Sequence, residues 1–336
     1  RRYRRRPMFL PSHYPKRMVR RPQTPVGPFP YTTEEVSFSN GDAVLKGTLT
    51  MPADCDRKTP VLVMVTGSGL QNRDEEFSGH KPFAVIADAF ARAGIATLRY
   101  DDRGFGESTG DVVLCTTEDL KNDALAGVKL LRDRFERVGV IGHSEGGTIA
   151  LMLAGERQVD FAVSLAGMIV SGAETLLAQN RRAFESAGLP ESEVEAFARL
   201  LSDTFTAIRT RAPLPSADNY DITDALRKNY AAALPSFRTP YMEFFLGLDL
   251  SASLSGITCP VMALNGTKDT QVQCDRNIAV LKAGLPSNSR SVIRAEDGLN
   301  HLFQHCVTGE VSEYKNIEET FSPEVLSEMI AWIKTL

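Results

Sequence analysis

The sequence predicts an α/β fold with a mostly parallel central sheet, helices on both faces of the sheet and an antiparallel hairpin at its start. Strand-like and helix-like segments alternate between residues 61 and 166, which is typical of parallel strands joined by helical crossovers. The first of these strand-like segments, residues 61–65, is apolar throughout, as in a strand buried on both faces. A glycine-flanked serine separates one of these strands from a helix, which indicates a sharp turn at the carboxyl edge of the sheet.

The elements follow in order along the chain. Residues 35–38 and 45–50 alternate polar and apolar side chains on either side of Asn40-Gly41-Asp42, so they form a hairpin with one solvated face. The regular alternation comes next. We expect strands over residues 61–65, 95–100, 137–141 and 159–166, helices over residues 82–93, 117–134 and 145–156, and two later strands near residues 259–264 and 291–294.

Residues 172–250 interrupt this alternation. They read as helices broken by prolines, Pro235 among them, with no strand before residue 260. We therefore expect a helical cap inserted at the carboxyl edge of the sheet, where α/β folds bind ligands. A dense aromatic cluster in the cap predicts a pocket wall of Tyr241, Phe244 and Phe245. The predicted organisation is a basic, proline-rich strap or linker over residues 1–30, a core over residues 31–171 and 251–336, and the cap over residues 172–250.

Charge is unevenly distributed along the chain. Residues 1–22 hold nine Lys or Arg and no acidic residue, whereas the other 314 residues hold 29 basic and 42 acidic ones. The acidic body argues against nucleic acid as a partner, and no run approaches the roughly 18–20 apolar residues of a membrane span. Because the chain starts with Arg1 rather than Met, we expect that an upstream piece was removed, either in maturation or in production of the protein.

The segment Gly142-His143-Ser144-Glu145-Gly146 carries the candidate nucleophile. Its two glycines leave room for strand and helix backbones that approach closely around a serine with strained dihedral angles. A serine hydroxyl is a weak nucleophile at neutral pH until a base takes its proton. A nucleophile at such a turn therefore requires an acid and then a histidine later in the chain.

Asp269 and His301 are the candidate acid and base. Asp269 follows the apolar run 259–264, and His301 follows the strand-like run 291–294 and a Gly-Leu-Asn turn. We predict a triad with Ser144, in which the carboxylate fixes the imidazole tautomer and stabilises the imidazolium as it forms. The alternatives are His305 for the base, and Asp275 or Asp297 for the acid.

An oxyanion hole needs two backbone N–H donors. One is that of Glu145, the residue after the serine, and the other comes from the loop after the third strand. The strand over residues 61–65 ends in Thr66-Gly67-Ser68-Gly69-Leu70, whose glycines let the backbone approach a substrate carbonyl. The second donor is therefore Ser68, Gly69 or Leu70.

We expect no cofactor and no metal. The five cysteines form no Cys-x-x-Cys pair and no cluster with histidine, so nothing predicts a zinc site. The odd number leaves at least one free thiol. The expected partner is a small acyl ester. The sequence does not decide whether the chain forms a homodimer.

Five motifs together carry a family resemblance. They are Arg-Tyr-Asp-Asp-Arg-Gly-x-Gly-x-Ser at residues 99–108, the segments 67–75, 79–83 and 142–146, and Asn300-His301. In this combination the chain resembles the EstD-like bacterial carboxylesterases of the α/β-hydrolase superfamily over about residues 20–336. The resemblance implies the α/β-hydrolase fold and the triad already named. It also implies hydrolysis of short acyl esters without a metal, and an exported protein, periplasmic or secreted, rather than a cytoplasmic one.

Other functions agree less well with the sequence. Thioester or peptide hydrolysis uses the same acyl-enzyme chemistry and stays the alternative, but a CoA thioesterase would be expected to carry a basic groove. A non-catalytic binding module would have lost a member of the triad. We also predict that Arg73-Asp74-Glu75 and Asp101-Asp102-Arg103 form ion pairs that brace loops near the site rather than take part in catalysis.

Overall fold

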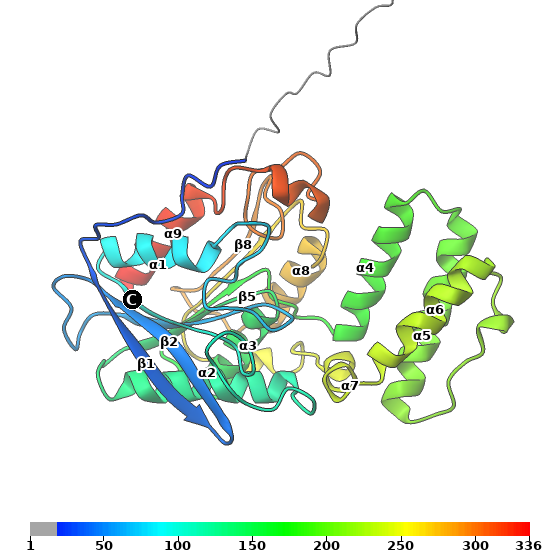
Figure 1. Cartoon of the computed structure of the whole chain (residues 1–336), viewed down its shortest axis with the longest axis horizontal. Coiled ribbons are helices and arrows are strands. Elements are labelled where there is room, and N and C mark those ends of the chain that lie inside the picture. Colours follow the sequence, from blue (N-terminus) through cyan, green and yellow to red (C-terminus); the bar gives the residue numbers. More distant parts are fainter. Residues whose placement is uncertain (1–18) are drawn as a thin grey trace, which may run out of the picture.

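The computed structural model describes residues 19–336, which form one mixed sheet with helices on both faces (Figure 1). The strand order is β1-β2-β4-β3-β5-β6-β7-β8. The pairs β1–β2 and β2–β4 are antiparallel, and all other neighbours are parallel. The predicted fold class is therefore confirmed. The strands are β1 Thr32–Asn40, β2 Ala43–Met51, β3 Val61–Val65, β4 Ala96–Tyr100, β5 Val138–His143, β6 Ala162–Leu165, β7 Val261–Gly266 and β8 Val292–Glu296.

Two apolar cores lie on the two faces of the sheet. Because successive side chains of a strand point to opposite faces, Val61 and Val63 of β3 belong to one core and Leu62 and Met64 to the other. Helices α2, α3 and α8 cover the first core, and α1 and α9 cover the second. Their bounds are α1 Pro82–Arg92, α2 Thr117–Arg132, α3 Glu145–Gly155, α8 Cys274–Gly284 and α9 Pro323–Thr335.

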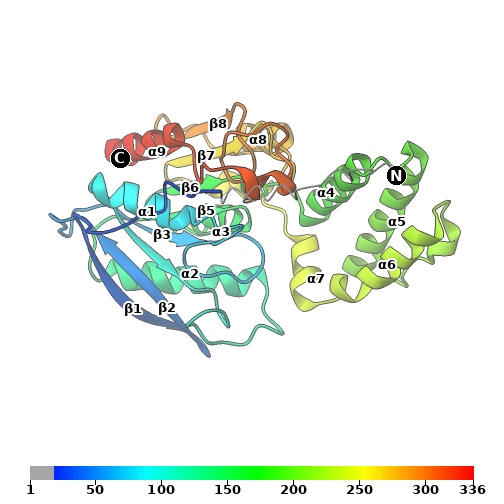
Figure 2. The same ribbon diagram turned by 45° about the horizontal axis from the view of Figure 1, so that its top comes forward.

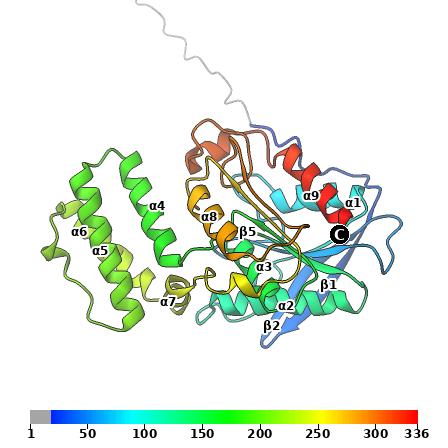
Figure 3. The same ribbon diagram turned by 180° about the vertical axis from the view of Figure 1, so that it is seen from behind.

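Four helices stand to one side of the sheet, and they occupy most of the segment between β6 and β7 (Figures 1 and 3). Side chains of α5 and α6 such as Phe205 and Tyr230 pack into a core of their own. Helices α4 and α7 lie nearer to the sheet than α5 and α6 do (Figure 2). The bounds are α4 Gly172–Ser186, α5 Glu191–Thr210, α6 Asp224–Phe237 and α7 Pro240–Gly247, with short 3-10 turns η1 Ala217–Asn219, η2 Leu254–Gly256 and η3 Val311–Asn316 elsewhere.

The expectation that Pro235 breaks a helix is wrong. Pro235 lies inside α6, two residues before the helix ends at Phe237. A proline lacks one backbone N–H, and in the last turn of a helix this removes a single hydrogen bond without interrupting later turns. The strand expected over residues 159–166 is also shorter, since β6 covers Ala162–Leu165.

The part of the predicted strap that the structure describes lies against the C-terminal loops. Arg21 donates from its guanidinium to the carbonyls of Ser78, at 2.8 Å, and Ile317, at 2.9 Å. Gln23 donates to the carbonyl of Phe321 at 2.7 Å. Residues 1–18, which hold most of the Lys and Arg residues of the predicted strap, lie outside the described residues. Across residues 19–336, no helix is both long and apolar enough for a membrane crossing.

The turn from β5 to α3 requires glycine on both sides of Ser144. A Cβ atom on Gly142 would overlap the carbonyl of Gly146, and one on Gly146 would overlap the carbonyl of Val65. These neighbours are backbone atoms of the sheet and of a buried helix, so they do not move aside as a flexible side chain would. The close approach of β3, β5 and α3 therefore depends on these glycines.

We expect Gly142→Ala to lower the free energy of unfolding by about 3 kcal/mol or more, because its methyl group overlaps a backbone carbonyl in a packed core. Gly247→Ala is the matched control, since no atom lies within 4 Å of a Cβ built there. The control should stay within about 1 kcal/mol of the wild type. Urea denaturation measures both variants, and equal losses would contradict the steric explanation.

Candidate active site

Ser144 lies at the turn between β5 and α3. Its dihedral angles, φ 56° and ψ −119°, fall outside the regions that non-glycine residues normally adopt. Its backbone N–H donates to the carbonyl of Leu165 at 2.8 Å, which ties the turn to β6. A Cβ on Gly67 would lie 3.2 Å from the Ser144 Cβ, so the loop after β3 passes directly beside the serine.

Asp269 and His301 are hydrogen-bonded partners. Asp269 follows β7, His301 follows β8, and the His301 Nδ1 lies 2.7 Å from the Asp269 Oδ2. Their side chains are 0% and 4% exposed, respectively. The other carboxylate oxygen, Oδ1, accepts the N–H groups of Gln271 and Val272 at 2.8 and 2.9 Å. Since a carboxylate accepts, Nδ1 carries a proton, and the free Nε2 is left to act as a base.

The alternative acids and base have other surroundings. His305 Nδ1 lies 2.8 Å from Glu319, and its side chain is 55% exposed. Asp297 accepts the hydroxyl of Thr267 at 3.3 Å. Asp275 is exposed in the first turn of α8. None of the three lines the cavity that contains Ser144.

A cavity of about 390 Å³ brings the candidate residues together. Ser144 and His301 line it, and Met168 and Leu176 add apolar surface. From α7, Tyr241, Met242 and Phe245 line it. Phe244, which we predicted in the pocket wall, is not among the lining residues, because the α-helical period turns it to a different side of α7. Of the three oxyanion-loop candidates, Ser68 lines the cavity, while Gly69 and Leu70 do not.

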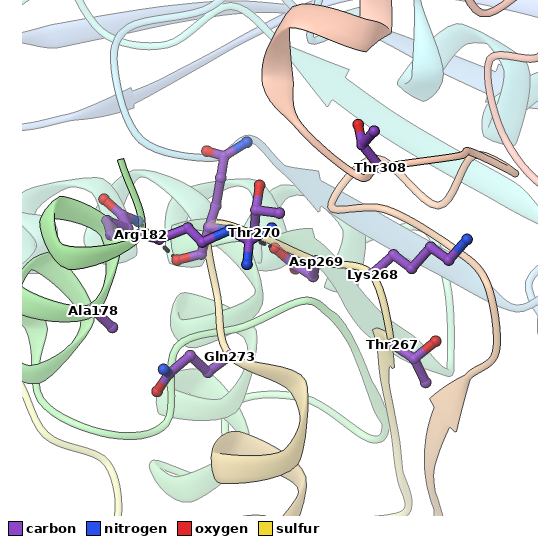
Figure 4. Close-up of a pocket in the computed structure, with 10 residues that line it drawn as sticks. Ala178, Arg182, Thr267, Lys268, Asp269, Thr270, Gln273 and Thr308 are labelled. Atoms are coloured by element: carbon purple, nitrogen blue, oxygen red, sulfur yellow. Dashed lines mark hydrogen bonds between the residues drawn. The ribbon is translucent and has the colours of Figure 1, made fainter. Parts of the chain in front are cut away.

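A second cavity, of about 320 Å³, lies beside Asp269 between α4 and the loop after β7 (Figure 4). Arg182 and Lys268 are its two cations. Arg182 pairs with Glu310 at 2.9 Å, and the Lys268 ammonium donates to the carbonyls of Cys306 and Val307. The cavity does not contain Ser144 or His301, so we assign the chemistry to the first cavity.

Buried carboxyl groups hold the loop after β3. Asp102 accepts the hydroxyl of Thr66 at 2.8 Å and the N–H of Gln71 at 2.8 Å. Burial raises the pKa of Asp102 to about 8, more than these hydrogen bonds lower it. Asp101 pairs with Arg73 at 3.0 Å. The loop that carries Ser68 is thereby fixed at both ends.

Glu145 has a buried side chain that connects the core to α7. It is 0% exposed, and its two oxygens accept the hydroxyls of Thr117 at 2.6 Å and Tyr241 at 2.5 Å. Burial, followed by the charge of Glu145, raises the pKa of Tyr241. The residue whose N–H is a candidate oxyanion donor is therefore anchored by a residue of α7.

Sequence reasoning missed two residues of the site. Glu75 and His143 form a buried pair, with the His143 Nδ1 at 3.0 Å from the Glu75 Oε1. The required chain order excludes His143 as the base because it precedes Ser144, and the sequence predicts only an ion pair that braces a loop for Glu75. The available signal was the place of His143 at the end of a buried strand, where a polar side chain requires a partner.

Comparisons with known proteins bear on the family and the fold of the chain. A sequence model of the family Hydrolase_4, described as "Serine aminopeptidase, S33", matches residues 80–303. Esterase EstD of Thermotoga maritima is 35% identical over 124 residues. This match covers 36% of the chain and 30% of EstD, so the chain spans less than a third of that protein. It confirms the predicted resemblance to EstD.

Solved structures with the same fold cover most of the chain. The esterase Pf2001 of Pyrococcus furiosus is 18% identical with a TM-score of 0.55, covering 96% of this chain and 99% of its own. A proline iminopeptidase of Mycobacterium smegmatis is 16% identical with a TM-score of 0.56, covering 90% and 98%. Est1E of Butyrivibrio proteoclasticus, with ferulic acid bound, is 18% identical with a TM-score of 0.52, covering 89% and 99%. At these identities the likeness shows the fold alone.

Asp102→Asn should flatten the dependence of stability on pH between about pH 5 and 8. The folded state keeps a proton on Asp102 up to about pH 8, whereas the unfolded chain releases it near pH ~4. Stability is therefore lost as pH rises through this window, by at most about 1.4 kcal/mol per pH unit. Asn does not ionise, so the variant lacks this loss. Urea denaturation at about pH 5, 6.5 and 8 measures the difference.

Asp101→Asn is the control for this experiment. Burial alone would raise the pKa of Asp101, but hydrogen bonds from Arg73 and Glu107 outweigh it and lower the pKa. Asp101 is therefore ionised in both states throughout the window. Its replacement should reduce stability at every pH and leave the slope unchanged. A slope that is equal in the wild type and in Asp102→Asn would contradict the assignment.

Proposed function

The chain belongs to the serine aminopeptidase S33 family of hydrolases, Hydrolase_4, and on this premise we propose that it is a serine esterase that hydrolyses short-chain carboxylic esters. One observation carries the proposal. His301, which is hydrogen-bonded to Asp269 at 2.7 Å, lines the same cavity as a strained Ser144. This arrangement supports nucleophilic catalysis by a Ser-His-Asp triad.

The reaction proceeds through an acyl-enzyme. The Ser144 Oγ attacks the ester carbonyl carbon while the His301 Nε2 takes the hydroxyl proton. Asp269 holds the Nδ1 proton and stabilises the imidazolium. The imidazolium then gives its proton to the leaving alcohol as the C–O bond breaks, and the acyl group stays on Ser144. Water, deprotonated by His301, repeats the attack and releases the acid.

Backbone donors take up the negative charge that develops on the carbonyl oxygen. The N–H of Glu145 lies at the N-terminus of α3, where the helix dipole favours negative charge. Ser68 supplies the second N–H, since it is the member of the candidate loop that lines the cavity. Such preorganised donors contribute about 3–4 kcal/mol each to transition-state stabilisation.

The cavity favours an ester over an aminopeptidase substrate. A protonated amino terminus needs an acceptor of opposite charge when it is buried. Glu75 is the acidic residue that lines the cavity, and its carboxyl group already binds Gly67 and His143. Among the residues that line the cavity, no other acidic side chain is present. An uncharged acyl ester fits this lining better.

The remaining alternatives have less support. No Lys or Arg is present among the residues that line the cavity, so a thioester with a polyphosphate group would find no cation there. A binding module does not require a strained serine in the same cavity as a paired histidine. Backbone strain of this kind reduces stability, and it is typical of catalytic and other functional sites. Both alternatives are tested by the substrates below.

Ser144→Ala and His301→Gln should each reduce kcat for p-nitrophenyl butyrate by about 10³-fold or more, because the triad acts as a unit. His305→Gln, four residues away, should retain wild-type turnover. A fluorophosphonate probe should label the wild type and fail to label Ser144→Ala. Labelling that persists in Ser144→Ala would rule out this nucleophile. Faster turnover of an aminoacyl p-nitroanilide or an acyl-CoA would replace the ester assignment.

Phe245→Ala should shift the acyl preference toward longer chains. Phe245 lines the cavity, and its removal makes room for methylenes that each contribute about 0.8 kcal/mol. We expect acetyl to butyryl esters to be preferred by the wild type, and the ratio of octanoyl to butyryl kcat/KM to rise about 10-fold or more in the variant. Phe244→Ala, which removes a neighbouring ring that does not line the cavity, should leave the ratio unchanged. Equal ratios in all three proteins would show that α7 does not limit acyl length.

A further inference from the structure

Glu75 and His143 form a second carboxylate–histidine pair beside the proposed triad. Glu75 lies in the loop before α1, and His143 is the last residue of β5. The two side chains are 6% and 7% exposed. The His143 ring centroid lies 4.7 Å from that of His301. The pair is therefore buried and directly adjacent to the proposed base.

Both ring nitrogens of His143 face groups that only accept hydrogen bonds. Nδ1 lies 3.0 Å from the Glu75 Oε1, and Nε2 lies 2.8 Å from the backbone carbonyl oxygen of His301. The same Oε1 also accepts the N–H of Gly67 at 2.8 Å. The carbonyl oxygen of His301 can only accept, so Nε2 donates to it. With Glu75 as a carboxylate, Nδ1 donates as well, and the pair of an imidazolium and a carboxylate satisfies all three contacts.

This ion pair connects the proposed base to the loop that carries the proposed oxyanion donor. Its imidazolium end holds the backbone of His301, the proposed base. Its carboxylate end holds the N–H of Gly67, which precedes Ser68 and lies beside Ser144. The loop at Gly67 and the loop at His301 are distant in the sequence, and the Glu75–His143 pair joins them through hydrogen bonds.

We propose that the Glu75–His143 ion pair is a positioning unit, which rests on the proposed esterase function and fixes the base His301 relative to the Ser68 oxyanion donor. Neither residue exchanges a proton with substrate. The pair acts because catalysis requires the base and the oxyanion donors to be held within a fraction of an ångström of their productive places. A neutral His143 would keep only one of its two hydrogen bonds, and the connection would be broken.

The pH at which the pair breaks follows from its surroundings. The ionisable groups that face His143 are Glu75, from the loop before α1, and Asp269 and His301, from the loops after β7 and β8. Burial alone would lower the pKa of His143, but the charge and hydrogen bond of Glu75 outweigh it and raise the pKa above its ordinary value. The raised pKa and the two hydrogen bonds of His143 both favour its charged form. As pH rises through this pKa, the proton and one hydrogen bond are lost, and activity falls.

The first test is the pH profile of kcat/KM for a p-nitrophenyl ester in the wild type, Glu75→Gln and His143→Gln. Glu75→Gln removes the charge that raises the pKa of His143, so the alkaline limb should move to lower pH by about 1 unit. His143→Gln should lose that limb. Both variants should lose about 10-fold or more in kcat with KM changed less than about 3-fold. A loss of kcat with an unmoved alkaline limb in both variants would overturn the proposal.

The matched control is the exposed pair His305–Glu319, which has the same chemistry with an Nδ1 to Oε1 distance of 2.8 Å. Glu319→Gln and His305→Gln should keep the wild-type kcat and the wild-type alkaline limb. An equal shift of the limb in Glu319→Gln would show that the effect reflects overall charge rather than position, and would overturn the proposal.

The second test does not depend on activity. Ring 15N shifts of His143, measured by NMR in Ser144→Ala as pH rises from about 6, should report protons on both nitrogens until the pH exceeds the ordinary histidine pKa of about 6.5. A His143 ring with one protonated nitrogen at about pH 6.5 or below would overturn the proposal. If no ester is turned over, the proposed function fails while this measurement still decides the charge of His143. The two failures are thereby distinguishable.

Discussion

The close approach of β5, α3 and the loop after β3 is the constraint on which the rest of the site depends. Gly142 and Gly146 have no side chain to separate these backbones, and their contact holds Ser144 at φ 56°. The strain persists because β3 and β6 pair with β5 on its two sides. The Ser144 hydroxyl is thereby fixed at one edge of the sheet, and loops from other strands can be positioned relative to it.

Three buried carboxyl groups surround this fixed point. Removing a carboxyl group from water is costly unless its oxygens accept hydrogen bonds. Glu75 and Glu145 each accept from two different segments, and Asp102 accepts from the two ends of the loop after β3. The cost is offset locally, and every carboxyl group becomes a junction between segments. Such junctions fix the position of a loop, and a backbone N–H that stabilises an oxyanion must be fixed in position before the reaction. The junctions are Asp102 with Thr66 and Gln71, Glu75 with Gly67 and His143, and Glu145 with Thr117 and Tyr241.

The sequence predicts those features that follow from local pattern. Apolar runs and their order specify the sheet. Chain order and the position just after a strand point to Asp269 and His301, which the structure brings within 2.7 Å of each other. It does not predict features that depend on how distant segments meet. The pairing of His143 with Glu75 joins β5 to a loop near residue 75, and no periodicity reports it. The direction of Phe244 depends on the rotation of α7 about its axis, which aromatic density does not reveal.

Helix α7 links the pocket wall to the oxyanion side of the site. Tyr241 and Phe245, stacked with ring centroids 5.8 Å apart, line the cavity from this helix. The Tyr241 hydroxyl also donates to Glu145, directly after Ser144. A displacement of α7 would leave an oxygen of this buried carboxyl group without its donor, which costs about 1–3 kcal/mol. Helix α7 is therefore held in place by Glu145, the residue whose backbone N–H is the proposed oxyanion donor, so under the proposed function acyl fit and transition-state stabilisation depend on the same hydrogen bond.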